Sequence, residues 1–121
     1  MSSNPIHDRI VSSLADYIEQ ILHFRIIGVA LEGRSQPSQV YGRVPDIEAI
    51  DPVTGSPVYG EAEECDTLTI QHTTQQLTAF SSVPRAKVYL SVPAACVAEA
   101  QALIQQSFRG RDITVLQYGS G

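Results

Sequence analysis

Hydrophobic and polar positions follow two rhythms along this chain, one typical of helices and one typical of strands. Near the N-terminus, apolar residues recur every three or four positions over residues 6–21, behind an Asn4-Pro5 pair that suits the start of a helix. This spacing predicts an amphipathic helix over residues 5–22. The next run, residues 24–31, is rich in β-branched side chains and predicts a strand, and residues 32–42 lack periodicity and predict a loop.

The rest of the chain predicts four more strands and two more helices. A turn built from Pro and Gly separates the first two of these strands, and four Thr residues weaken the helical pattern of the first of these helices. The strands are expected over residues 45–50, 57–63, 86–92 and 113–118, and the helices over residues 67–80 and 94–108.

The order αβββαβαβ contains no linker, internal repeat or low-complexity block, so we expect one domain over residues 1–121. The hairpin is antiparallel, whereas the later β-α-β crossover is parallel. The sequence therefore predicts an α/β fold with a mixed central sheet flanked by helices.

Composition indicates a globular protein of the cytoplasm. The hydrophobic fraction is 43% and the charged fraction 17%, and no apolar stretch is long enough to span a bilayer. The N-terminal residues lack the basic and apolar regions of a secretory leader, so we expect a cytoplasmic location and no membrane partner. Cys65 and Cys96 have no CxxC spacing, and we expect reduced thiols rather than a disulfide.

The net charge of −5 argues against indiscriminate binding of nucleic acid, because that affinity comes mostly from Lys and Arg beside phosphates. The eight basic residues are spread along the chain and form no basic arm. A local basic face remains compatible with this distribution.

Three acidic residues are expected to meet in space. If residues 45–50 and 57–63 pair as a hairpin, Asp46 approaches Glu61, and Glu63 shares a strand face with Glu61. Such carboxylates repel one another unless a cation binds or one of them takes a proton, so we expect at least one raised carboxyl pKa. The alternative is a solvated hairpin end with exposed acids.

The Pro45-Asp46 pair, the Glu61-Ala62-Glu63 triplet and the order of elements resemble the PD-(D/E)XK nuclease superfamily, which includes restriction enzymes and archaeal Holliday-junction resolvases. The resemblance implies a restriction endonuclease-like core in which Asp46 and Glu61 ligate Mg²⁺ or Mn²⁺. Glu63 stands where the family usually has Lys, and some restriction enzymes use Glu at the corresponding place. The resemblance thus implies that Glu63 ligates the metal or activates water, unless it marks a site that has been lost.

Further residues follow from the same resemblance. Asp8 is the candidate fourth carboxylate, with Glu19 as a competitor on the same helix. Gln76 fits a Gln-x-x-x-aromatic pattern whose Gln orients a phosphate or a ligand. Arg43 is the candidate phosphate contact. The simpler interpretations are an acid that complements the helix dipole for Asp8 and a surface helix residue for Gln76.

Other reactive residue types give no motif of their own. The three His residues lack the HxH or HExxH spacing of a zinc site, and Glu48 is more simply a solvated strand acid.

Two functions follow as hypotheses. The first is a metal-dependent DNA endonuclease that hydrolyses phosphodiester bonds, with branched DNA among its candidate substrates. The alternative is a catalytically inactive nuclease-like domain that serves as a subunit, a DNA-associated factor or a scaffold. Because a chain of this length has little extra material for reading DNA sequence, we expect a homodimer or a larger complex, formed through the hairpin or the last strand.

Overall fold

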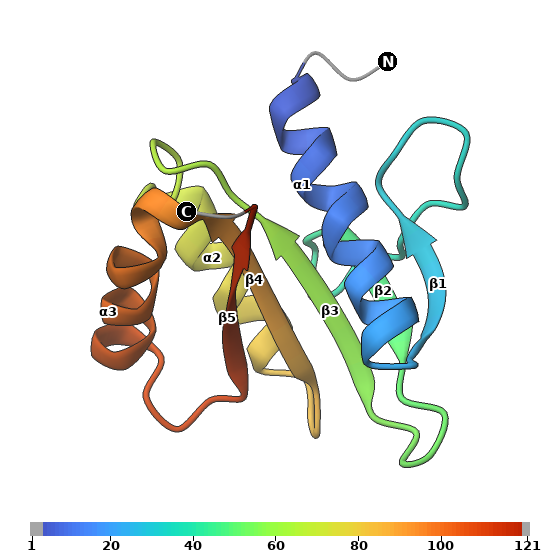
Figure 1. Ribbon diagram of the computed structural model, residues 1–121. Coiled ribbons are helices and arrows are strands. Elements are labelled where there is room, and N and C mark those ends of the chain that lie inside the picture. The colour runs from blue at the N-terminus through green and yellow to red at the C-terminus, as the bar shows by residue number, and fades with distance from the viewer. Residues whose placement is uncertain (1–3, 120–121) are drawn as a thin grey trace.

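A five-stranded mixed sheet, with its strands in chain order, forms the centre of the structure (Figure 1). This computed structural model describes residues 4–119. Residues 1–3 and 120–121 lie outside the described residues, so the expectation about the N-terminal residues falls mostly outside them. The first three strands are antiparallel, and the last two pair in parallel with their predecessors. The strands are β1 (Arg25–Val29), β2 (Ile47–Ile50), β3 (Pro57–Ala62), β4 (Lys87–Pro93) and β5 (Ile113–Tyr118).

Helices cover both faces of the sheet. Helix α1 (Pro5–Asp16) continues into a π-helical turn, Tyr17–Ile21, and packs on one face; α2 (Gln71–Ser81) and α3 (Val97–Ser107) pack on the other (Figure 1). A short 3₁₀ turn, Ala94–Cys96, leads into α3. The predicted αβββαβαβ order and the mixed α/β fold are thereby confirmed.

Helix α1 begins where its sequence predicts. The side chain of Asn4 accepts a hydrogen bond from the backbone N–H of His7 at 3.1 Å, and Pro5 occupies the first helical position. Of the predicted apolar stripe, the middle is buried, but Ile6 and Ile21 at its two ends are exposed.

Helix α2 starts four residues later than predicted, at Gln71 rather than at Thr67. The hydroxyl of Thr67 donates to the Glu63 carboxylate, and the hydroxyl of Thr73 donates to the backbone carbonyl of Thr67. These side-chain hydrogen bonds compete with helical ones and hold residues 67–70 in turns.

Each face of the sheet has its own hydrophobic core. On the α1 side, Ile10, Leu14 and Ile18 pack against Ile47 and Val58 of the sheet. On the other side, α2 and α3 cover alternate residues of the same strands through the buried residues Tyr59, Leu77, Phe80, Val88, Leu90, Val92 and Ala100. The acidic residues Glu61 and Glu63 lie at the C-terminal end of β3, between the helical layers.

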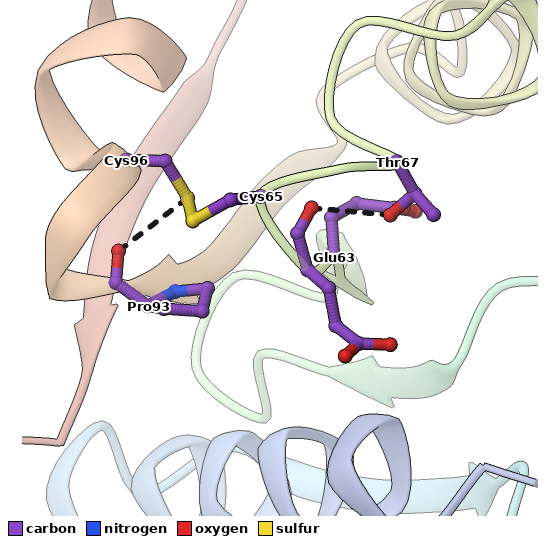
Figure 2. The surroundings of a disulfide bond; sticks show 6 residues. Glu63, Cys65, Thr67, Pro93 and Cys96 are labelled. Carbon is purple, nitrogen blue, oxygen red and sulfur yellow. Dashed lines mark hydrogen bonds between the residues drawn. A yellow bond between two sulfur atoms is a disulfide. The ribbon is translucent and has the colours of Figure 1, made fainter.

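The expectation of reduced thiols is wrong in this structure, because Cys65 and Cys96 form a disulfide. The bond joins the segment after β3 to the turn before α3, two residues beyond Glu63 (Figure 2). The two thiols meet because β3 and β4 are parallel neighbours, so the C-terminal ends of both strands lie side by side. Disulfides are uncommon in the cytosol, so this bond counts against the predicted cytoplasmic location. That location stays a prediction.

Two further expectations concern surfaces. None of the helices in residues 4–119 is long and apolar enough to cross a membrane. The β2–β3 hairpin is an incorrect choice for a dimer edge, because β2 pairs with both β1 and β3, and β3 with both β2 and β4. The edge strands are β1 and β5, so of the two predicted dimer surfaces the last strand remains.

Candidate functional site

The β2–β3 hairpin brings Asp46 and Glu61 together, as its sequence predicts. Ile47 pairs with Gly60, which places the residue before β2 opposite the fifth residue of β3. The backbone N–H of Asp46 donates to Glu61 Oε1 at 3.1 Å, and the backbone N–H of Ala62 donates to Asp46 Oδ2 at 2.9 Å. Backbone geometry thus fixes both carboxylates.

These carboxylates line a pocket of about 390 Å³, here called the acidic pocket. Its walls come from the start of α1, the loop before β2, the end of β3 and the first half of α2. Its lining residues are His7, Gly42, Arg43, Val44, Asp46, Glu61, Glu63, His72 and Gln76. Five of the six predicted site residues are therefore brought to one place.

Glu61 and Glu63 are both buried, and both have raised pKa values, as the sequence predicted for at least one carboxyl here. Burial raises the pKa of Glu61 well above its ordinary value, and the negative charges of Asp46 and Glu63 raise it further. Burial also raises the pKa of Glu63, although hydrogen bonds from Thr67 and Thr73 oppose the shift. Figure 2 shows Glu63 and Thr67 on the segment that the disulfide anchors.

His7 supplies the cationic group beside the acids. Its Nε2 lies 3.0 Å from the carbonyl oxygen of Ala62 and 3.3 Å from Asp46 Oδ2. Since both partners accept hydrogen bonds, Nε2 is the donor. The hydrogen bond to Asp46 raises the pKa of His7 from 6.5 to about 9, although burial opposes the shift, so the ring is protonated at neutral pH.

Gln76 and Arg43 close the pocket from the α2 side. Gln76 is buried and donates from Nε2 to the carbonyl oxygen of Val44 at 3.1 Å. Its side chain also hydrogen-bonds Glu61, which lowers the pKa of that acid against the larger effect of burial. The Arg43 guanidinium lies over α2, where it donates to Gln75 Oε1 and approaches His72 Nδ1 at 3.4 Å.

Asp8 is not brought into the acidic pocket. It lies behind His7, with Oδ1 at 3.9 Å from His7 Nδ1, in the first turn of α1. Its competitor Glu19 lines a different hollow, beside Gly28 and Arg34. Glu48 accepts a hydrogen bond from the backbone N–H of Ser38 at 2.9 Å and also lies outside the lining.

The donor chemistry of the pocket fits a hard divalent cation. Asp46, Glu61 and Glu63 offer carboxylate oxygens, the ligands that Mg²⁺ and Mn²⁺ prefer. Burial is the main cause of the raised pKa of Glu61, and the negative charges of Asp46 and Glu63, which a cation would neutralise, add to it. Within residues 4–119, however, no three His, Cys, Asp or Glu side chains already stand in a metal-binding arrangement. Backbone N–H groups donate to one oxygen each of Asp46 and Glu61, and His7 contacts the same oxygen of Asp46.

Comparison with known proteins supports the fold. The crystal structure of a repair endonuclease from Pyrococcus abyssi resembles this chain with a TM-score of 0.56 at 9% sequence identity, over 100% of this chain and 50% of the other. The chain thus spans about half the length of that nuclease and shares its fold. No protein-family model and no curated protein sequence matches the chain.

Sequence reasoning missed His7. Its neighbour Asp8 was selected for the first turn of α1, whereas the structure turns His7 toward Asp46. A weak signal existed: Asn4 caps the helix, so His7 falls in the first turn, at the end of α1 that the fold brings to the carboxylates. Spacing within the chain gave no hint, because residues distant in sequence build the site.

Proposed function

We propose that this chain is a metal-dependent nuclease of the PD-(D/E)XK type that hydrolyses phosphodiester bonds in DNA. The proposal depends above all on the convergence of Asp46, Glu61 and Glu63 on one pocket at the end of β3. The fold shared with a repair endonuclease is further support.

In this proposal Asp46 and Glu61 hold Mg²⁺ or Mn²⁺. The cation, when bound, supplies charge neutralisation at the phosphate and makes water a better nucleophile. Glu63, with one oxygen held by the Thr67 hydroxyl at 2.7 Å, accepts the proton of the attacking water. The water oxygen bonds to phosphorus, the bond to the leaving oxygen breaks, and that oxygen takes a proton from solvent.

The remaining pocket residues position these groups. Arg43, at the rim, binds the phosphate through its guanidinium. Gln76 spans Glu61 and the Val44 carbonyl, and so keeps the buried carboxylate in place. His7 orients Asp46 from the α1 side, with its Nε2 at 3.3 Å from Asp46 Oδ2.

The test is cleavage of linear and branched DNA with Mg²⁺ or Mn²⁺, together with calorimetric titration of the metal. We expect Glu61→Gln to lose metal binding and to lower the cleavage rate by about 100-fold or more, since a lost ligand removes several kcal/mol of transition-state stabilisation. Glu99→Gln, which alters an exposed acid in the first turn of α3, is the matched control and should keep both activities.

A second candidate function is an inactive nuclease-like subunit. Two observations favour it: His7 Nε2 already contacts Asp46 Oδ2, and Glu63 stands where the family usually has Lys. Wild-type protein that binds no metal and cleaves no DNA would select this function over the first. Glu63→Lys then tests whether the missing Lys is the only defect of the site. A gain of cleavage in this variant requires that the other pocket residues can still support catalysis.

A further inference from the structure

The turn Val40–Arg43 lies beside the acidic pocket and presents an exposed aromatic ring. The backbone N–H of Val40 donates to the carbonyl oxygen of Arg43, and that of Arg43 donates back at 3.1 Å, which makes a two-residue hairpin. Both central residues have positive φ, 52° at Tyr41 and 79° at Gly42, as a type I′ turn requires. Tyr41 is 67% exposed.

The choice of tyrosine at this position is not explained by the turn. Type I′ turns favour Asn, Asp or Gly at the first central position, because a bulky side chain is disfavoured at positive φ. The exposed ring of Tyr41 also adds little burial in return. Backbone strain at a surface residue beside a reactive pocket points to a functional use of that side chain.

A second hollow, of about 320 Å³, runs from this turn along α2 and is here called the Tyr41 groove. Its walls include Tyr41, Arg43, Thr74, Gln75 and Thr78. Arg43 lines both the Tyr41 groove and the acidic pocket, so the two hollows adjoin at this residue.

The charge of this groove differs from that of the protein as a whole. The chain has 13 acidic residues, yet α2 contains none and no acid lines the groove. Arg43 forms no ion pair with any carboxylate of residues 4–119. Arg111 lies at the far end of α2, where it donates to the Thr78 carbonyl at 3.4 Å and the Ser82 hydroxyl at 2.9 Å. A neutral track between two arginines suits a polyanion.

We propose that the Tyr41 groove binds an unpaired DNA strand that leads into the acidic pocket, with a base stacked on Tyr41 and a phosphate at Arg43. This inference rests on the proposed function and names the form of its substrate. An aromatic ring stacks on the face of any base, and those faces are free in an unpaired strand but covered in a duplex. The Thr and Gln side chains along α2 supply neutral hydrogen-bonding groups beside the strand.

The experiment measures fluorescence anisotropy of a labelled oligothymidylate and of a duplex of equal length, both in EDTA so that no cleavage occurs. We expect Tyr41→Ala to weaken binding of the single strand by about 5- to 100-fold, the usual value of one stacked base. Tyr41→Phe keeps the ring and should bind within about two-fold of wild type. Neither variant should change the affinity for the duplex.

Arg43→Ala should weaken single-strand binding and reduce its dependence on salt, because one phosphate contact is lost. Arg25→Ala, which removes an equal charge from an exposed position on β1, is its control and should have no effect.

Equal single-strand affinities of wild type and Tyr41→Ala, or equal losses on single strand and duplex, would overturn the inference. A parallel cleavage assay with Mn²⁺ separates it from the proposed function. Cleavage of DNA without an effect of Tyr41→Ala on binding would support the nuclease and overturn the binding role of the Tyr41 groove. Tyr41-dependent binding without cleavage would support the groove and count against the nuclease. Wild-type protein that binds neither DNA overturns the groove outright.

Discussion

His7 links α1 to the acidic pocket and makes the stability of the metal-free protein depend on pH. Its pKa rises from 6.5 to about 9 on folding, mainly through the hydrogen bond to Asp46. The stabilisation is therefore complete below pH 6.5 and is lost as the pH rises through about 9.

We expect wild type in EDTA to lose about 1–3 kcal/mol of unfolding free energy across this window relative to His7→Gln. Urea unfolding at a series of pH values measures the difference. His23→Gln, at an exposed position after the π-helical turn, should behave as wild type. Parallel pH profiles for wild type and His7→Gln would contradict the ion pair.

At the same scale, the sequence predicted the acids but not their partners. Asp46, Glu61 and Glu63 were accessible to reasoning because one hairpin and one strand alternation relate them. His7 is 39 residues before Asp46 and depends on how α1 crosses the sheet, and no local pattern encodes that crossing. Asp8 was selected instead because the resemblance pointed to an acid.

Among the elements, the segment between β3 and α2 carries Glu63 and is held at Cys65 by the disulfide (Figure 2). The bond closes a loop of sequence separation 31, which predicts about 3–4 kcal/mol of stabilisation from restricting the unfolded chain. We expect dithiothreitol to lower the free energy of unfolding of wild type by about this amount.

The matched control is the double variant Cys65→Ser with Cys96→Ser, whose stability should not respond to dithiothreitol. Free thiols in the purified, air-oxidised wild type, measured with Ellman's reagent, would contradict the disulfide. The sequence could not favour this pairing, because two cysteines outside a CxxC motif say little, and only the parallel course of β3 and β4 brings them together.

Element boundaries show the same division between local and distant causes. The strand over residues 113–118 and the start of α1 were predicted to the residue, because local alternation and the Asn4-Pro5 cap determine them. Helix α2 was placed four residues too early, since the hydroxyl of Thr67 is engaged by Glu63, a partner that periodicity does not reveal.

On the scale of the whole molecule, β5 offers an open edge for self-association. Because β2, β3 and β4 are paired on both sides, a homodimer through the sheet uses β1 or β5, and the predicted edge is β5. We expect Thr114→Lys, at an exposed position of β5, to shift sedimentation toward monomer, because like charges oppose edge-to-edge pairing. Gln106→Lys, on the exposed part of α3, is the control. Wild type that stays monomeric at every concentration would remove the dimer.

The strand order β1-β2-β3-β4-β5 also bears on how the protein is made. Because each new strand joins the edge left by the one before it, the sheet can lengthen in step with synthesis, as domains commonly form from their N-terminal side. Asp46, Glu61 and Glu63 are all synthesised by residue 63, whereas Gln76 comes with α2 and Cys96 later still. A chain whose synthesis has reached β4 thus contains all three acids before Cys96, the disulfide partner of Cys65, has been made.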